Sequence, residues 1–383
     1  MFIDLTVDQV ALRDELRAYF EALVTPELSA RLADDDHAAE REVVRRMGAD
    51  GWLGVGWPTA YGGQGRSAIE QYLFFEEAQR AEVPTPLIAL NTVGPALMAF
   101  GTEEQRSRFL PAILRGEVYI AVGYSEPEAG TDLASLTTRA ERDGDEWVIN
   151  GQKMWTTGAE TADYIWLAAR TDPAAPRHKG ITMFLVRTDV AGLGISPVHT
   201  LVGHRTNATY YDDVRVPATA VVGDVNGGWS LITTQLNFER SSVVGTSLVE
   251  KLADATAMWA VANGRMELAW VRSALARVKA LMDALRLMNW RVAWSITNAT
   301  FDAAGASAVK VYGTESVIEA YRLLLEVLGP AGAIKEGSPG ALVKGRLERQ
   351  YRRAILTTFG AGVNEIQRDI IAMVGLKMPA SPR

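Results

Sequence analysis

The 383-residue chain contains no cysteine. This absence excludes disulfides, thiolate nucleophiles and cysteine-ligated metals, and it fits a protein made in a reducing compartment. The chain has four histidines, and no two of them stand at the spacing of a metal-ligand pair: His37, His178, His199 and His204. Because zinc and related metals are usually held by closely spaced histidines and cysteines, the sequence predicts no metal site.

An excess of positive charge and long apolar runs are also missing. The formal net charge of −7 would repel a phosphate backbone, so nucleic-acid binding is not expected. No stretch approaches the roughly 18 apolar residues of a membrane span. The first twenty residues carry charges every few positions, unlike a signal peptide. The sequence therefore predicts a soluble, cytoplasmic protein without a membrane or nucleic-acid partner.

The residues that are present divide the chain into three segments. Residues 1–118 show helical spacing, and Thr6 with Gln9 forms a plausible capping box at the start of the first helix. Residues 119–225 contain short β-branched and aromatic runs, with a hairpin turn expected at Asp143-Gly144-Asp145. From residue 226 to 383 the helical period returns, with apolar residues three and four apart.

These segments predict an α+β fold with three domains. An N-terminal α-helical domain (1–118) precedes a barrel-like middle domain of antiparallel strands (119–225), and a C-terminal four-helix bundle (226–383) follows. Within that last domain, the pattern from Trp259 to Thr297 predicts one long bundle helix.

Four motifs occur in a fixed order along the chain. They are Tyr124-Ser-Glu-Pro-Glu-Ala-Gly-Thr-Asp132, Asn150-Gly-Gln-Lys-Met-Trp-Thr-Thr-Gly158, Tyr211-Asp-Asp-Val-Arg-Val-Pro217 and Glu365-Ile-Gln-Arg368. Each resembles a signature of the acyl-CoA dehydrogenase family, and the resemblance covers nearly the whole chain in the right order. The resemblance implies the fold of that family, FAD as cofactor, an acyl-CoA substrate, and an electron-transfer flavoprotein or a similar protein as electron acceptor.

The resemblance also implies roles for residues in the first two motifs. Trp155 would pack against the flavin ring, Thr157 would donate toward its N5 edge, and Ser125 would reach its pyrimidine edge. The remaining cofactor-binding candidates lie beside these three: Tyr124, Gly130, Thr131 and Thr156. Thr131 and Arg240 are the candidates for substrate binding. Without the motif, a buried tryptophan of the sheet core would be the ordinary interpretation of Trp155.

Acyl-CoA dehydrogenation needs a carboxylate that removes the α-proton. In many family members it lies four residues before the Glu-Ile-Gln motif, where this chain has Ala361. Other branches place it on the first helix of the C-terminal domain, directly before an arginine, and here that position holds Glu239. Glu239 falls in an apolar helical stripe, where partial burial would raise its pKa and suit a general base. The alternative is a glutamate that reaches out to an ion pair, although the adjacent Arg240 points elsewhere.

The half-site that homo-oligomeric relatives donate to a neighbour's FAD is altered. Its Arg-x-x-Phe-Gly element is missing, with Arg265 as a stray cation, and Glu326 stands where a glutamine is expected. A glutamate beside a pyrophosphate would repel it. The pattern resembles the base-carrying subunit of actinobacterial heterotetrameric steroid-CoA dehydrogenases, completed by a second family member as α2β2. A homo-oligomer that binds FAD by other contacts is the alternative.

Two other functions remain open on this fold. The first is an acyl-CoA oxidase-type or nitroalkane oxidase-type flavoenzyme. The second is a degenerate, non-catalytic partner subunit, favoured by Ala361 and Glu326 and opposed by Glu239 and the intact flavin-side motifs. The acyl group itself is undefined: small residues at Ser241-Ser242 and Gly245-Thr246-Ser247 would accommodate either a ring system or close helix packing.

Overall fold

The computed structural model describes residues 4–33, 36–203, 205–239 and 244–379. Contacts divide the chain into two compact units. The helical unit comprises Met1–Ser29, Arg66–Pro84 and Arg240–Arg383, and the sheet unit comprises Ala30–Gly65 and Thr85–Glu239. Each unit thus joins segments that are distant in the sequence.

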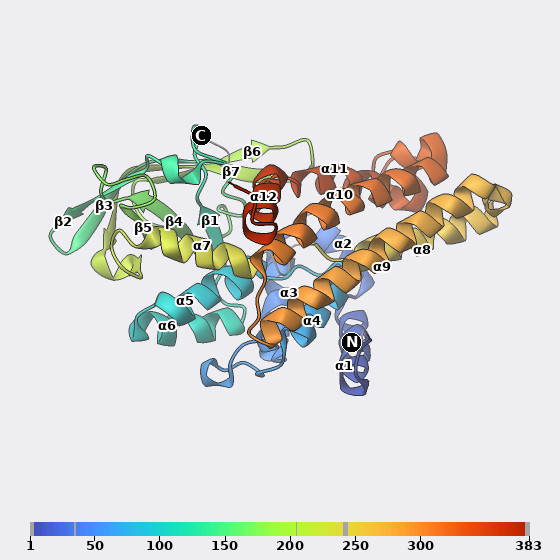
Figure 1. Ribbon diagram of the computed structural model, residues 1–383, viewed down its shortest axis with the longest axis horizontal. Coiled ribbons are helices and arrows are strands. Elements are labelled where there is room, and N and C mark those ends of the chain that lie inside the picture. The colour runs from blue at the N-terminus through green and yellow to red at the C-terminus, as the bar shows by residue number, and fades with distance from the viewer. Residues whose placement is uncertain (1–3, 34–35, 204, 240–243, 380–383) are drawn as a thin grey trace. The chain divides into compact units, whose positions relative to one another are not determined.

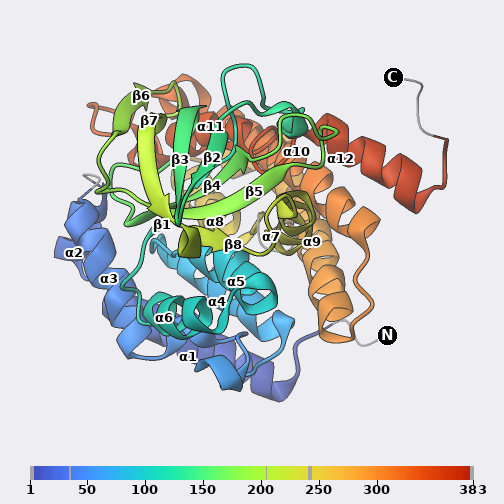
Figure 2. The same ribbon diagram turned by 90° about the vertical axis from the view of Figure 1, so that its left-hand side faces the viewer.

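An eight-stranded sheet forms the centre of the sheet unit (Figure 2). Its strands, in chain order, are β1 (Ile120–Gly123), β2 (Arg139–Asp143), β3 (Glu146–Lys153), β4 (Tyr164–Arg170), β5 (Ile181–Arg187), β6 (Leu193–His199), β7 (Arg205–Pro217) and β8 (Val221–Val222). The spatial order is β6-β7-β3-β2-β4-β5-β8, and β1 pairs with β4. The predicted hairpin is present, since Asp143 pairs with Glu146 across a turn in which Gly144 has a φ of +62°.

The sheet is mixed, which corrects the expectation of a purely antiparallel domain. The pairs β1–β4 and β2–β4 are parallel, whereas the other neighbouring strands are antiparallel. Parallel neighbours need a long connection between them, and here β1 reaches β4 only after the β2–β3 hairpin has intervened. Local alternation of residues identifies a strand but carries no information about which distant strand it will join.

Helices complete the sheet unit. They are α3 (His37–Ala49), the π-helix η3 (Ala89–Val93), α5 (Gly94–Phe100), α6 (Glu103–Leu114) and α7 (Gly228–Glu239). Helix α7 contacts α5, η3 and β5. Helix α2 (Pro26–Ala33) spans the boundary between the two units.

The helical unit consists of α1 (Val7–Leu23), α4 (Ala68–Ala81), α8 (Ser247–Ala262), α9 (Ala269–Thr297), α10 (Ala303–Leu328), α11 (Arg346–Leu356) and α12 (Asn364–Ile370). The predicted capping box is confirmed, because the Thr6 hydroxyl accepts from the Gln9 amide while the Gln9 side chain accepts from Thr6 N. The prediction of one helix from Trp259 was wrong. Helix α8 ends before Gly264, whose φ is +65°, and α9 then returns beside α8 (Figure 1).

Candidate active site

The loop between β1 and the 3₁₀ turn at Leu133–Ser135 carries the first motif, and we call residues 124–132 the motif loop. A buried ion pair fixes it to the end of β3. The Lys153 ammonium, which is fully buried, donates to the Glu126 carboxylate at 2.8 Å and to the Tyr124 carbonyl at 2.9 Å. Glu126 also accepts hydrogen bonds from the amides of Thr137 and Thr138 at 2.7 and 2.9 Å. The two flavin-side motifs are therefore joined at one buried point.

The charge state of this pair follows from its surroundings. Burial opposes ionisation of Glu126, but the charge and hydrogen bond of Lys153, with the bonds from Thr137 and Thr138, outweigh it and lower the pKa of Glu126 to about 2. Burial lowers the pKa of Lys153 to about 8, against the opposing influence of Glu126. This ion pair was not predicted from the sequence, although Glu126 and Lys153 both lie inside the quoted motifs.

Trp155 lies directly beyond the buried lysine. Its indole is 55% exposed, and its φ of +67° places it in the left-handed region that a bulky residue adopts only when its surroundings impose it. Both flanking residues are held: Met154 N donates to Ser125 O, and Thr156 N donates to Asn207 O, each at 2.8 Å. A flat aromatic surface is thus presented outward on a rigid support, which excludes the alternative that Trp155 is a core tryptophan.

The other predicted cofactor residues differ in accessibility. The Thr157 side chain is exposed, with its hydroxyl 3.0 Å from that of Thr206, and Ser125 is half-buried. Thr156 is fully buried, and its hydroxyl lies 3.4 Å from the Thr209 hydroxyl inside the sheet. The last two, Gly130 and Thr131, are exposed on the motif loop.

Tyr124 joins the motif loop to α7. Its hydroxyl donates to the Gln235 carboxamide oxygen at 2.6 Å, and the Trp166 indole N–H donates to the same oxygen at 2.9 Å. Glu239, the candidate base, is the last residue of α7 and follows Gln235 by about one helical turn. Arg240 lies outside the described residues. Gln235 was not predicted, although its spacing of three from Ile232 and four from Glu239 placed a polar residue in the same stripe.

The C-terminal loop, residues 357–363 between α11 and α12, contains Ala361. Ala361 has a φ of +55° and Gly362 a φ of +93°. The buried Lys310 ammonium donates to the Thr358 carbonyl at 3.2 Å and to the Asn364 amide oxygen at 2.9 Å, so the loop is held at both ends. Its conformation is well defined although it offers no carboxylate at position 361.

Glu326 and Arg265, the residues of the half-site predicted to be altered, also lie in the helical unit. Glu326 forms an ion pair with Arg322 one turn earlier on α10. The Arg265 guanidinium lies 5.8 Å from the centre of the Trp270 ring. Glu326 therefore has an ion-pair partner within this chain, and Arg265 has an aromatic neighbour.

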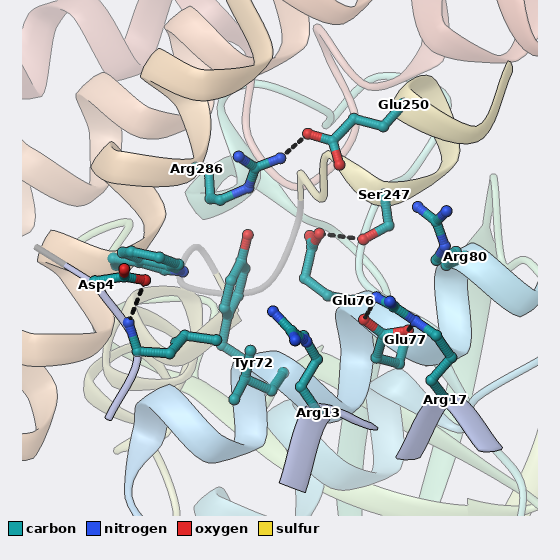
Figure 3. A pocket seen from close by; sticks show the side chains of 13 residues that line it. Asp4, Arg13, Arg17, Tyr72, Glu76, Glu77, Arg80, Ser247, Glu250 and Arg286 are labelled. Carbon is teal, nitrogen blue, oxygen red and sulfur yellow. Dashed lines mark hydrogen bonds and ion pairs between the residues drawn. The ribbon is translucent and has the colours of Figure 1, made fainter. Parts of the chain in front are cut away.

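A cavity of about 280 Å³ lies within the helical unit, lined by α1, α4, α8 and α9 (Figure 3). Its wall contains compensated charges, such as Arg17 with Glu77 at 2.7 Å and Arg286 with Glu250. None of the predicted flavin-side residues lines it. Among the described residues there is no cluster of metal-ligating side chains, and no described helix has the length and apolar character needed to cross a membrane.

Three family models match successive parts of the chain: the N-terminal domain of acyl-CoA dehydrogenase over residues 6–117, the middle domain over 121–214 and the C-terminal domain over 226–376. The chain belongs to the acyl-CoA dehydrogenase family. FadE26, an acyl-CoA dehydrogenase of Mycobacterium tuberculosis, is 48% identical over 400 residues, and the match covers all of both chains.

Two solved structures extend this comparison. The structure described as the Tcur3481-Tcur3483 steroid ACAD is 51% identical, with a TM-score of 0.94 and full coverage of both chains. A chain of the ChsE4-ChsE5 complex from Mycobacterium tuberculosis is 48% identical, with the same TM-score and coverage.

The predicted fold class and enzyme class are confirmed by these matches. The protein is an acyl-CoA dehydrogenase, an oxidoreductase that acts on a CH–CH bond. The family is one of flavoproteins. Neither the oxidase nor the non-catalytic alternative is favoured by these relatives.

Proposed function

We propose that this acyl-CoA dehydrogenase uses FAD to introduce an α,β double bond into the CoA thioester of a steroid side chain. Glu239 is the base in this proposal, and a second, different family member completes the enzyme as an α2β2 assembly. The steroid substrate is supported by the 51% identical steroid ACAD and the two-subunit assembly by the ChsE4-ChsE5 complex. A fatty acyl-CoA is the alternative substrate.

The single observation that supports the flavin site most strongly is the conformation of Trp155. A left-handed φ of +67° holds the indole 55% exposed on anchored backbone, and a planar isoalloxazine matches the shape of its exposed face. Thr157, which is exposed in the turn after β3, and Ser125, which is half-buried on the motif loop, supply hydroxyl groups. These residues fit FAD: Trp155 would stack on the ring, and Thr157 and Ser125 would bond to its polar edges. Tyr124 and Thr156 would support the site, since their hydroxyls already face Gln235 and Thr209.

The reaction divides between the cofactor and this chain's own residues. When bound, FAD accepts the hydride that leaves the β carbon. The Glu239 carboxylate takes the α-proton, and the electron pair of that C–H bond becomes the new C=C bond. Arg240, which follows Glu239 directly, and Thr131 on the exposed motif loop are the proposed substrate contacts.

The second subunit is supported by the state of the half-site in the helical unit. Glu326 is paired with Arg322, so this position offers a neighbour's FAD a committed carboxylate where a glutamine amide is expected. If a different chain completes the FAD site, this chain does not need to contribute FAD-binding residues to its neighbour. An electron-transfer flavoprotein is the proposed acceptor of the electrons.

The experiment is anaerobic bleaching of the bound flavin, measured with the chain alone and co-expressed with each family member encoded in the source genome. We expect FAD to be retained only in a mixed complex. In that complex, the CoA thioester of a steroid side chain should bleach the flavin. Retention and bleaching by the chain alone would contradict the two-subunit proposal. Equal bleaching rates with palmitoyl-CoA would contradict the steroid specificity.

A further inference from the structure

Three side chains of the sheet unit meet at one oxygen atom, and we call Tyr124, Trp166 and Gln235 the Gln235 triad. The Gln235 carboxamide oxygen accepts from the Tyr124 hydroxyl at 2.6 Å and from the Trp166 indole at 2.9 Å. The indole N–H also lies 3.0 Å from the Tyr124 hydroxyl oxygen. An indole N–H can only donate, so the amide of Gln235 must present its oxygen to this group. The orientation of the Gln235 amide is therefore fixed, with its oxygen toward Tyr124 and Trp166.

Burial of Trp166 and Gln235 makes it energetically costly to break these hydrogen bonds. Trp166 is fully buried and Gln235 is 2% exposed, and the neighbouring Leu231 and Ile232 of α7 are buried as well. If α7 rotated or slid along its axis, the Tyr124 hydroxyl and the Trp166 N–H would both lose the Gln235 oxygen, and the Tyr124 oxygen would be the acceptor that remains for the indole. The loss of an acceptor by a buried donor is unfavourable. A single polar contact inside an apolar interface can in this way select one register of a helix.

The first turn of α7 has a second contact in the same unit. The Trp229 ring lies edge-on to the ring of His178, a residue of the loop between β4 and β5, with 4.8 Å between the ring centres. Arg177 of that loop pairs with Asp132 of the motif loop at 2.7 Å. Both ends of the motif loop are thus connected to α7, one through Tyr124 and the other through Asp132.

We propose that Gln235 is a positioning residue for the base. Together with Tyr124 and Trp166, Gln235 fixes the rotation and register of α7 against the motif loop. It thereby sets the position of the Glu239 backbone, one turn later, relative to the substrate. This inference rests on the proposed role of Glu239. It assigns a function to a side chain that does not touch the reacting atoms.

The test compares three variants of the assembled enzyme. Gln235→Met preserves length and removes the acceptor, and it should lower kcat by roughly 10- to 100-fold, because a small displacement of a catalytic group has effects of that size. FAD content should change by less than about threefold, since Trp155 and Thr157 are held by contacts that do not involve Gln235. Tyr124→Phe removes one of two donors and should give a smaller loss in the same direction.

The matched control is Gln105→Met, which alters another buried glutamine of the sheet unit. Gln105 is 5% exposed and donates to the carbonyls of Thr219 and Val221, which are not part of α7. The Gln105→Met variant should be less stable than the wild type but keep the wild-type kcat.

Gln235→Glu is the rescue variant, because it retains an acceptor oxygen. It should recover most of kcat at high pH, and the acid limb of its kcat–pH profile should move to higher pH. A second carboxylate one turn from the base opposes the base's ionisation.

A double-mutant cycle separates this inference from the assignment of the base. Denaturant unfolding of the apo-chain should show that Gln235→Met with Tyr124→Phe loses less than the sum of the two single losses, whatever residue is the base. An active Glu239→Gln variant with that coupling intact would refute the proposed base and leave the triad's structural contact standing. Additive losses, or equal kcat values for Gln235→Met and Gln105→Met, would overturn the positioning role.

Discussion

The motif loop and the C-terminal loop are both anchored by a buried lysine, and they differ in what they present. Lys153 holds the motif loop through the Glu126 carboxylate and the Tyr124 carbonyl. Lys310 holds the C-terminal loop through the Thr358 carbonyl and the Asn364 amide oxygen. The motif loop supports accessible residues suited to flavin, whereas the C-terminal loop presents Ala361 at the position where the family resemblance predicts a base. A buried lysine can therefore hold a loop in place whether or not that loop carries a reactive side chain.

The strongest way to break this comparison is to remove the charge of Glu126. Glu126→Gln leaves the Lys153 ammonium buried without a carboxylate, and we expect the free energy of unfolding to fall by about 3–5 kcal/mol. Denaturant unfolding followed by circular dichroism measures it. The matched control is Glu141→Gln on β2, where Glu141 pairs with Arg139 at 3.2 Å and is largely exposed. That change should cost less than about 1 kcal/mol, and equal costs would contradict the account.

The pH dependence of stability tests the same pair without a structural change. Lys153 and the local hydrogen bonds lower the pKa of Glu126 from 4.5 to about 2 despite its burial. The unfolded chain therefore takes up this proton first, so the stabilisation is complete above pH 4.5 and is lost as the pH falls toward 2. It amounts to about 3 kcal/mol. The difference in unfolding free energy between wild type and Glu126→Gln should shrink over that interval, and a constant difference would refute the assignment.

The corresponding change in the C-terminal loop should be milder. Lys310→Met leaves the Thr358 carbonyl and the Asn364 side chain without this donor, and we expect a loss of about 1–3 kcal/mol. Hydrogen exchange should show faster exchange at residues 357–363, and the exposed Lys279→Met on α9 is the control. A loss larger than that of Glu126→Gln would reverse the ranking of the two anchors.

Local sequence signals predicted much of this fold. The Thr6 capping box and the turn at Gly144 depend on residues within a few positions of each other, and both are present. The parallel pairing of β1 with β4 was not predictable from alternation, because it joins strands about forty residues apart. The break at Gly264 was missed because apolar spacing continued across it, although an Asn-Gly pair marked the end of α8.

The candidate site shows the same division. The motifs identified Trp155 and Thr157, but the contacts that support them join distant residues: Glu126 with Lys153, and Tyr124 with Gln235. No spacing rule connects such pairs, because their proximity depends on the completed sheet. The left-handed conformation of Trp155 is likewise imposed by its anchored neighbours and not by its own preference.

The most direct test of the central claim is Glu239→Gln in the assembled enzyme, with anaerobic flavin bleaching by its acyl-CoA as the measurement. The account predicts a fall in the bleaching rate of at least roughly 10²-fold, with FAD still bound. Glu104→Gln, on the exposed surface of α6, should leave the rate unchanged. Unchanged bleaching in Glu239→Gln would contradict the claim that the base of this enzyme lies at the end of α7.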